Sequence, residues 1–378
     1  MAFTSLTRRG AILAGCALAA APRAFAQPAK PAAGARAVTV AQLFDTSATQ
    51  QDVSKDFLIG SRAAWQDINL RGGLHGRAVQ HTSIEVDGSA ASVRAAIAQL
   101  RDNPSVVVLS GTAGDITAGH VVATLKQERL GIAHVAPWLQ NSSLDIDERT
   151  FPIFAARQEQ IVHALKSLTV MSVQEIGAVY ASDVEFNAYQ QEFERSAADL
   201  KIKLQTFRAG GDLIRLGQKL TQTTPAILLF VGGTPELAQF TQGLEKQSRQ
   251  RYVVALADVN LQTLMQMGAA RNTPIIATQA VPVVTASVPV VRMYREALAK
   301  LFDEPPTPLS LAGFIAARYT FEVLRDADAN LTRQSALAAF QRRANLDVGG
   351  FRVSFDQRRR GGTFVTQSML TQDGRVIG

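Results

Sequence analysis

Strand-like and helix-like stretches alternate along most of this 378-residue chain. Short apolar runs such as residues 106–109 are followed by segments whose apolar residues recur at helical spacing. Neighbouring parallel strands need a crossover connection, which is usually a helix, so this alternation predicts parallel sheets with helices on both faces. The same rhythm restarts after residues 151–154. We therefore expect two α/β lobes of related build.

Residues 69–77 (NLRGGLHGR) predict a sharp helix-to-strand turn. Before them, Phe57, Ala64 and Ile68 are spaced along one face of a helix, and Ser54 is placed to cap its start. The double glycine ends the helix, because glycine adopts a left-handed backbone at little cost. Residues 78–86 then have a strand pattern.

The first 26 residues are predicted to be an export signal. Arg8 and Arg9 precede an apolar stretch, residues 11–21, that is too short to span a bilayer, and residues 24–26 form a small-x-small cleavage site. The twin arginines also fit a twin-arginine signal, so both the Sec and the twin-arginine routes stay open. Residues 27–36 are rich in proline and alanine and are predicted to be a linker.

The only cysteine, Cys16, lies inside this predicted signal. Residues 13–16 resemble a lipobox, which would anchor the chain to a lipid, but few apolar residues separate Arg9 from Cys16. We favour cleavage after Ala26, which leaves a mature chain without disulfides, a thiolate nucleophile or a cysteine-ligated metal.

Charge gives no reason to expect a nucleic-acid partner. The formal charge of +7 falls to +4 without the three arginines of the signal. The remaining arginines are dispersed, and no basic helix with interleaved aromatics is present. The one basic run, residues 358–360, precedes two glycines and predicts a solvated turn. Beyond the signal, no segment is predicted to span a membrane.

Four local patterns together resemble a known family. They are WQDINLRGGLHGRAV, the aspartate after the second strand, AAIAQLRDNPSVVVLSG and GIAHVAPWLQN. In this order they resemble the type I periplasmic binding proteins, the leucine/isoleucine/valine-binding family of ABC-transporter receptors. The resemblance extends from about Ala37 to the end of the chain.

The resemblance implies two Rossmann-like lobes with parallel sheets, joined by a hinge that the chain crosses three times. Carried over to this sequence, the first lobe comprises residues 37–155 and 283–346. The second comprises residues 156–282 and 347–378. Periodicity alone does not reveal that the lobes are discontinuous.

In open parallel sheets, ligands bind beyond the carboxyl ends of the strands. The loop at residues 110–115 leads into a helix, whose first N–H groups bind anions readily, so Thr112 and Gly114 are candidate ligand contacts. In amino-acid-binding relatives, this loop is rich in serine and holds the ligand carboxylate. Asp115 stands where a serine is expected and would repel that group. A plain helix cap is its alternative role.

A second candidate loop covers residues 137–141. Here Trp138, Leu139 and Gln140 replace the small or hydroxyl residues that the relatives carry. The flat face of Trp138 suits an aromatic or branched ligand, and packing between the lobes is its alternative role. These departures speak against an ordinary leucine-like ligand.

The remaining candidates belong to the second half of the site. Arg157 lies at the lobe crossover, where it would reach a ligand carboxylate or tie the lobes together. Asp183 belongs to a strand-end loop, and Phe186 lies near the place where relatives carry an aromatic. Asp258 matches the region where relatives bind the ligand ammonium, with a helix cap as its alternative.

No catalytic signature is present. The chain lacks a G-x-S-x-G elbow, an H-E-x-x-H pair and a Walker loop, and its five histidines are scattered. We therefore predict no enzyme activity, no cofactor and no metal.

The expected function is that of a periplasmic receptor of an ABC importer. It would bind a small organic solute (an amino acid, an aromatic or branched carboxylate, or an amide) by closing its hinge and would then dock on an inner-membrane permease. A ligand-sensing module on the same fold is the alternative, and a periplasmic enzyme is a third.

Overall fold

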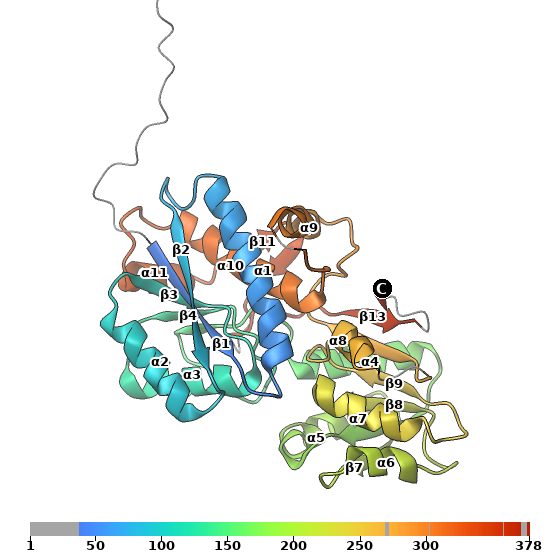
Figure 1. Ribbon diagram of the computed structural model, residues 1–378. Helices are drawn as coiled ribbons and strands as arrows, with labels where there is room; N and C mark the ends of the chain where they lie inside the picture. The colour runs from blue at the N-terminus through green and yellow to red at the C-terminus, as the bar shows by residue number, and fades with distance from the viewer. Residues whose placement is uncertain (1–37, 269–271, 302, 358, 372–375) are drawn as a thin grey trace, which may run out of the picture. The chain divides into compact units, whose positions relative to one another are not determined.

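The computed structural model describes residues 38–268, 272–301, 303–357, 359–371 and 376–378. The predicted signal with Cys16, its cleavage site and the predicted linker lie outside the described residues, as does Arg358. The expected α/β class is confirmed: two separate, mainly parallel sheets are each flanked by helices (Figure 1).

The first sheet is entirely parallel and has the strand order β2-β1-β3-β4-β5. Its strands are β1 (Val38–Asp45), β2 (Val79–Val86), β3 (Val106–Ser110), β4 (Ala133–Val135) and β5 (Thr150–Phe151). The flanking helices are α1 (Gln51–Leu70), α2 (Ala90–Asp102), α3 (Asp115–Glu128), α9 (Pro289–Leu301), α10 (Pro308–Arg325) and α11 (Arg333–Gln341). All five residues of β3 are buried, as expected of a strand covered on both faces.

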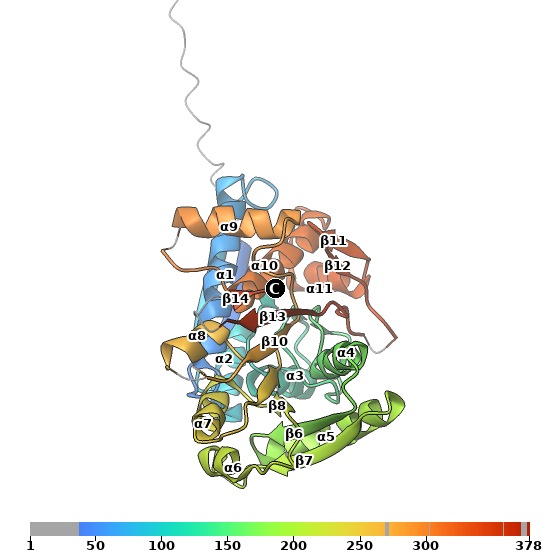
Figure 2. The same ribbon diagram turned by 90° about the vertical axis from the view of Figure 1, so that its right-hand side faces the viewer.

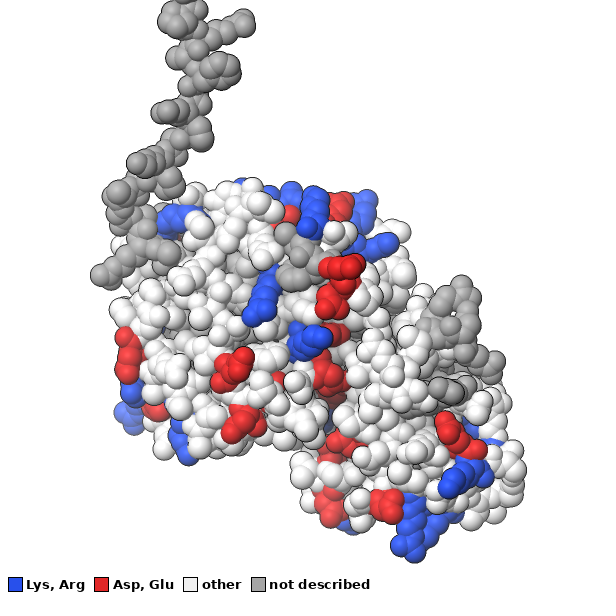
Figure 3. All heavy atoms as spheres, in the orientation of Figure 1, with Lys and Arg blue, Asp and Glu red and all other residues white. Residues whose placement is uncertain are grey.

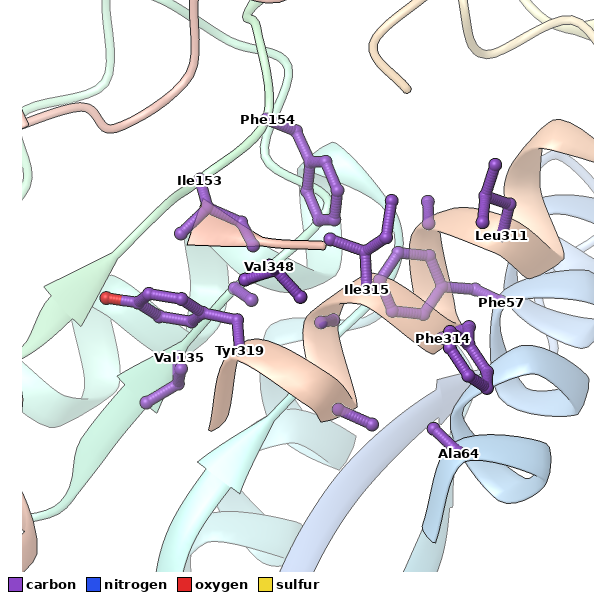
Figure 4. Packing of buried hydrophobic residues seen from close by; sticks show 14 of the residues in the cluster. Phe57, Ala64, Val135, Ile153, Phe154, Leu311, Phe314, Ile315, Tyr319 and Val348 are labelled. Atoms are coloured by element: carbon purple, nitrogen blue, oxygen red, sulfur yellow. The ribbon is translucent and has the colours of Figure 1, made fainter. Parts of the chain in front are cut away.

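Two apolar cores cover the faces of this sheet. Side chains of α2 and α3 pack on one face, with Val93, Ile97 and Val121 fully buried. The opposite core joins α1, α10 and β4 to the hairpin β11 (Leu346–Val348) and β12 (Phe351–Val353). Figure 4 shows Phe57 of α1, Tyr319 of α10 and Val348 of β11 in this second core.

The second sheet has the strand order β14-β13-β10-β9-β8-β6-β7. Its strands are β6 (Glu175–Tyr180), β7 (Lys203–Arg208), β8 (Ile227–Val231), β9 (Tyr252–Ala255), β10 (Ile275–Gln279), β13 (Thr366–Leu370) and β14 (Val376–Ile377). The helices are α4 (Arg157–Val170), α5 (Asp183–Asp199), α6 (Leu213–Lys219), α7 (Thr234–Leu244) and α8 (Leu261–Gln266). Helices α4 and α5 contribute to one core, and α6, α7 and α8 to the other.

One edge of the second sheet departs from the parallel pattern. β13 runs antiparallel to β10, and β14 antiparallel to β13. Figure 2 shows β13, coloured red, beside β10. Strands from near the end of the chain thus complete a sheet whose other strands lie between residues 175 and 279.

The predicted helix-to-strand turn is confirmed. α1 ends at Leu70, and Gly72 and Gly73 both have positive φ, at 105° and 68°. A Cβ on Gly73 would lie 2.0 Å from the carbonyl oxygen of Arg77, so no larger residue fits this turn.

Ser54 does not cap α1, contrary to the sequence prediction. The helix begins one turn earlier, at Gln51, and Ser54 is buried inside it. Its Oγ instead accepts a hydrogen bond of 2.8 Å from the backbone N–H of Asp45, at the end of β1. This contact holds the first strand end against α1.

Among the described residues, no helix combines the length and the apolar character that crossing a membrane requires.

Candidate functional site

Polar side chains from the strand ends of both sheets meet in one buried cluster. Asp258 follows β9 of the second sheet, and Trp138 follows β4 of the first. The Trp138 indole Nε1 donates a hydrogen bond of 2.9 Å to Asp258 Oδ1. This is the position that doubly wound sheets generally offer to ligands.

Arg157, the first residue of α4, lies between two carboxylates of this cluster. Its Nε donates to Asp258 Oδ2 at 3.0 Å, and its Nη2 contacts the same oxygen. Its Nη1 lies 3.3 Å from Asp115 Oδ2, within ion-pair distance but without hydrogen-bond geometry. Arg157 is 9% exposed and Asp258 5%, so the pairs are largely shielded from water.

Tyr189 of α5 completes the surroundings of Arg157. Its hydroxyl accepts a hydrogen bond of 2.8 Å from Arg157 Nη1, and its ring centroid lies 4.9 Å from the guanidinium carbon. Burial raises the pKa of the Tyr189 hydroxyl, so this group stays neutral beside Arg157.

Asp115 holds the neighbouring loop rather than capping its own helix. The residue before α3 is Gly114, which makes no side-chain cap. Asp115 Oδ1 instead accepts hydrogen bonds from the backbone N–H groups of Gln140 and, at 3.0 Å, of Asn141. Burial, together with the nearby charge of Asp258, raises the pKa of Asp115 to about 6, against the opposing attraction of Arg157.

The cluster has two carboxylates for one guanidinium. Burial alone lowers the pKa of Arg157, but the charges of Asp258 and Asp115 outweigh it and raise this pKa above its ordinary value. Arg157 is therefore always charged. With both carboxylates ionised, the cluster carries a net charge of −1.

This imbalance predicts a pH dependence. Asp115 holds its proton more tightly in the folded chain than at its ordinary pKa of 3.8, so its contribution to stability is fully present below about pH 3.8 and is lost as pH rises through about 6. We expect Asp115→Asn to lack this loss. Urea unfolding between pH 4 and pH 7 should show the variant gaining stability relative to the wild type as pH rises. Parallel pH profiles would contradict the assignment.

Trp138 is fully buried in an aromatic group. Its ring centroid lies 5.1 Å from that of Phe154 and 6.1 Å from that of Phe57. Its backbone N–H donates to the carbonyl of Thr112 at 2.8 Å, which joins the two predicted loops of the first sheet. Its indole edge thus faces Asp258 while its body packs in the core.

Gln140 and its neighbour Leu139 make different kinds of contact. The Gln140 side-chain oxygen accepts from Gln160 Nε2, whereas Leu139 packs in a small apolar group with Val122 and Ile146. Thr112 is fully buried, and its Oγ1 has no hydrogen-bond partner among the described residues. Gly114 has a φ of 101° and lies against the side chain of Gln50.

Asp183 and Phe186 lie apart from this cluster. Asp183 is exposed and pairs with Arg208, whose guanidinium carbon lies 4.2 Å from the centroid of the Phe186 ring. Phe186 also packs edge-on against Tyr180, at a centroid separation of 5.3 Å. These contacts stabilise the start of α5 and give neither side chain a contact with Asp258.

Three contacts were missed by sequence reasoning. Tyr189 binds Arg157, and Gln160 Oε1 accepts from the backbone N–H of Ala257 at 2.8 Å. Arg360 is buried and donates to the carbonyl oxygens of Leu139 and Asn141, so it is not part of a solvated turn. Gln160 lies three residues after Arg157 on the same buried face of α4, which is the one signal that would have found it.

A sequence model of the periplasmic binding protein family matches residues 37–373. The chain therefore belongs to that family. Family and fold are those of substrate-binding proteins rather than of enzymes, and membership of a periplasmic family implies export. No curated protein sequence matches the chain.

Solved structures share the fold at low sequence identity. An extracellular ligand-binding receptor from Verminephrobacter eiseniae has a TM-score of 0.80 and 17% identity, covering 90% of this chain and 100% of its own. A possible leucine/isoleucine/valine-binding protein from Rhodopirellula baltica has a TM-score of 0.79 and 17% identity, covering 91% and 96%.

A third similar structure carries a ligand. It is the substrate-binding protein of a branched-chain amino acid transporter from Streptococcus pneumoniae in complex with isoleucine, with a TM-score of 0.75 and 14% identity, covering 90% of this chain and 98% of its own. At such identities the likeness establishes the fold of this chain and not its ligand.

Proposed function

We propose that this protein is a periplasmic receptor that binds a small organic solute between its two lobes and delivers it to an inner-membrane ABC permease. The observation that carries the proposal is the meeting of strand-end groups from both sheets, through the contacts of Trp138 with Asp258 and of Arg157 with Asp115. A solute that contacts both lobes favours the state in which they are closed.

We propose the lobe boundaries that the family resemblance implies, residues 37–155 with 283–346 and residues 156–282 with 347–378. Each of the two larger sheets takes its strands from one of these sets. The hairpin β11–β12 packs in the core of the first lobe, so part of the second set serves the first lobe as well. Arg157 then lies at the first crossover.

Family membership supports the proposed location and partner. The similar structures are those of ligand-binding or substrate-binding proteins, one of them from a transporter. We propose that this chain reaches the periplasm by the Sec or the twin-arginine route and is released by cleavage after Ala26. The permease would recognise the closed form.

Thermal-shift screening tests the proposal directly. Purified protein is screened against amino acids, aromatic acids and short amides, and at least one solute is expected to raise the melting temperature. A solute at a hundred times its Kd stabilises the folded state by about 2.7 kcal/mol. A broad panel without any stabilising solute would contradict the proposal.

Matched variants locate the binding site for any solute found. We expect Asp258→Asn to weaken binding about tenfold or more, because it removes a buried charge at the centre of the cluster. Asp183→Asn is the control, since Asp183 is an acid in the same lobe that lies apart from the cluster. Equal effects of the two substitutions would place the solute elsewhere.

A further inference from the structure

A cavity of about 410 Å³ lies beside the buried cluster, between α1 and the helices of the second sheet. The start of α1 lines it from one side, with Asp52, Lys55 and Asp56. Thr234, the first residue of α7, and Asn260, the residue before α8, line it from the other. The cavity has the size of a small-molecule site. Burial and, to a smaller extent, the charge of Asp258 raise the pKa of Asp52, so the buried cluster contributes to the electrostatic field of this cavity.

Carboxylates from α1 dominate the charge of this cavity. Asp52 and Asp56 are one helical turn apart, and Glu304 lies in the same wall, against Lys55 as the lining cation. Figure 3 shows acidic side chains on the face where α1 and α8 lie. A positively charged solute is therefore favoured over an anion.

The hydrogen-bond partners of the two aspartates are neutral. Asp52 Oδ2 accepts from Thr234 Oγ1 at 2.8 Å. Asp56 Oδ2 accepts from Asn260 Nδ2 at 2.9 Å and from Thr307 Oγ1 at 2.8 Å. Among the described residues, neither aspartate forms an ion pair. Burial raises the pKa of both carboxyl groups, and the hydrogen bonds from Thr234, Asn260 and Thr307 only partly oppose it.

A second cavity, of about 210 Å³, adjoins the first. Both are lined by Asn260, Gln262 and Thr307. The wall of the second is mostly apolar and includes Met265, Val284 and Leu309. Burying an uncharged hydrocarbon group there would be favourable, whereas burying a second charge there would cost free energy.

We propose that the two cavities together bind a primary amine with an apolar substituent. The ammonium group would lie between Asp52 and Asp56, and the substituent would enter the cavity beside Met265. This inference names the substrate class within the proposed function and rests on it. Helices that flank each of the two sheets line the first cavity, so the amine would contact both lobes at once.

Four matched probes test the proposal by isothermal titration calorimetry. Hexylamine presents the charge and the chain, hexan-1-ol the chain alone, hexanoate the opposite charge, and hexane-1,6-diamine a second charge at the far end. We expect hexylamine to bind and the diamine to bind at least about tenfold more weakly. We expect no measurable binding of the alcohol or the acid.

Two variants, one that removes a negative charge and one that removes a positive charge, test whether these residues bind the amine. Asp56→Asn keeps an oxygen that can accept from Asn260 and Thr307 but removes the negative charge. We expect hexylamine to bind this variant at least about tenfold more weakly than the wild type. Lys55→Gln removes the lining cation and should tighten binding by up to about fivefold. Asp145→Asn, an exposed acid outside the cavity, is the control. Circular dichroism and the melting temperature of each unliganded variant verify its fold.

The outcomes separate this inference from the proposed function. If hexylamine fails to bind, or binds equally to the wild type and to Asp56→Asn, the amine assignment is overturned. In that case a solute found in the broad panel still supports the receptor function. If hexylamine binds and both variants shift its affinity in the expected directions, the assignment stands.

Discussion

Replacing Arg157 with alanine is expected to lower the free energy of unfolding by about 3–5 kcal/mol. The substitution removes the guanidinium from between Asp115 and Asp258 and leaves two buried carboxylates without a cation. It also leaves the Tyr189 hydroxyl without its donor. Urea unfolding monitored by circular dichroism measures the change.

Two further variants make this result specific. Lys126→Ala breaks the pair with Asp145, whose side chains are 63% and 89% exposed, and should cost less than about 1 kcal/mol. Combining Arg157→Ala with Asp115→Asn and Asp258→Asn should restore most of the lost stability, because the triple variant no longer buries two carboxylates without a cation. A loss as small as that of Lys126→Ala would show that the buried cluster does not carry this energy.

Replacing Gly313 with alanine should cost about 3 kcal/mol, because α1 and α10 touch along their backbones. A Cβ on Gly313 would lie 1.9 Å from the carbonyl oxygen of Phe57, and a Cβ on Gly60 would lie 1.6 Å from that of Ser310. Ser61 also donates to the carbonyl of Gly313 at 3.2 Å. Neither backbone can retreat without separating the two helices, which share the core that Figure 4 shows.

The same substitution at Gly119 is the matched control. Gly119 lies inside α3, and a Cβ there would meet its nearest atom, Leu144 Cδ2, at 3.9 Å. Alanine is a better helix former than glycine by up to about 1 kcal/mol, so Gly119→Ala should be neutral or stabilising. Equal melting temperatures for the two variants would contradict the close approach of α1 and α10.

Much of the fold could be predicted from local patterns, since alternation of strands and helices depends on residues close in sequence. β2, for example, covers residues 79–86 of the strand predicted at residues 78–86. The antiparallel pairing of β13 with β10 could not be read locally, because it joins residues about ninety positions apart. The predicted role of Ser54 was wrong for a different reason: its partner is the backbone N–H of Asp45 at the end of β1, whereas the capping pattern considers only the residues that follow it.

The candidate site was predicted in part. The predicted lobe crossover selected Arg157. Strand-end reasoning selected Asp115, Trp138 and Asp258, which the structure brings together with it. It also selected Asp183 and Phe186, which form a separate surface group with Arg208. A strand-end rule gives the edge of the sheet but not the direction of each side chain. It therefore missed Tyr189, which reaches Arg157 from the interior of a helix.

The antiparallel edge formed by β13 has a consequence for biosynthesis. The ribosome makes β6 to β10 well before residues 366–370, so the edge of β10 stays open until the carboxyl-terminal residues have emerged. An open edge of this kind pairs readily with other chains. Premature termination just before β13 should therefore yield a product that aggregates, and the nascent polypeptide would depend on chaperones until translation is complete.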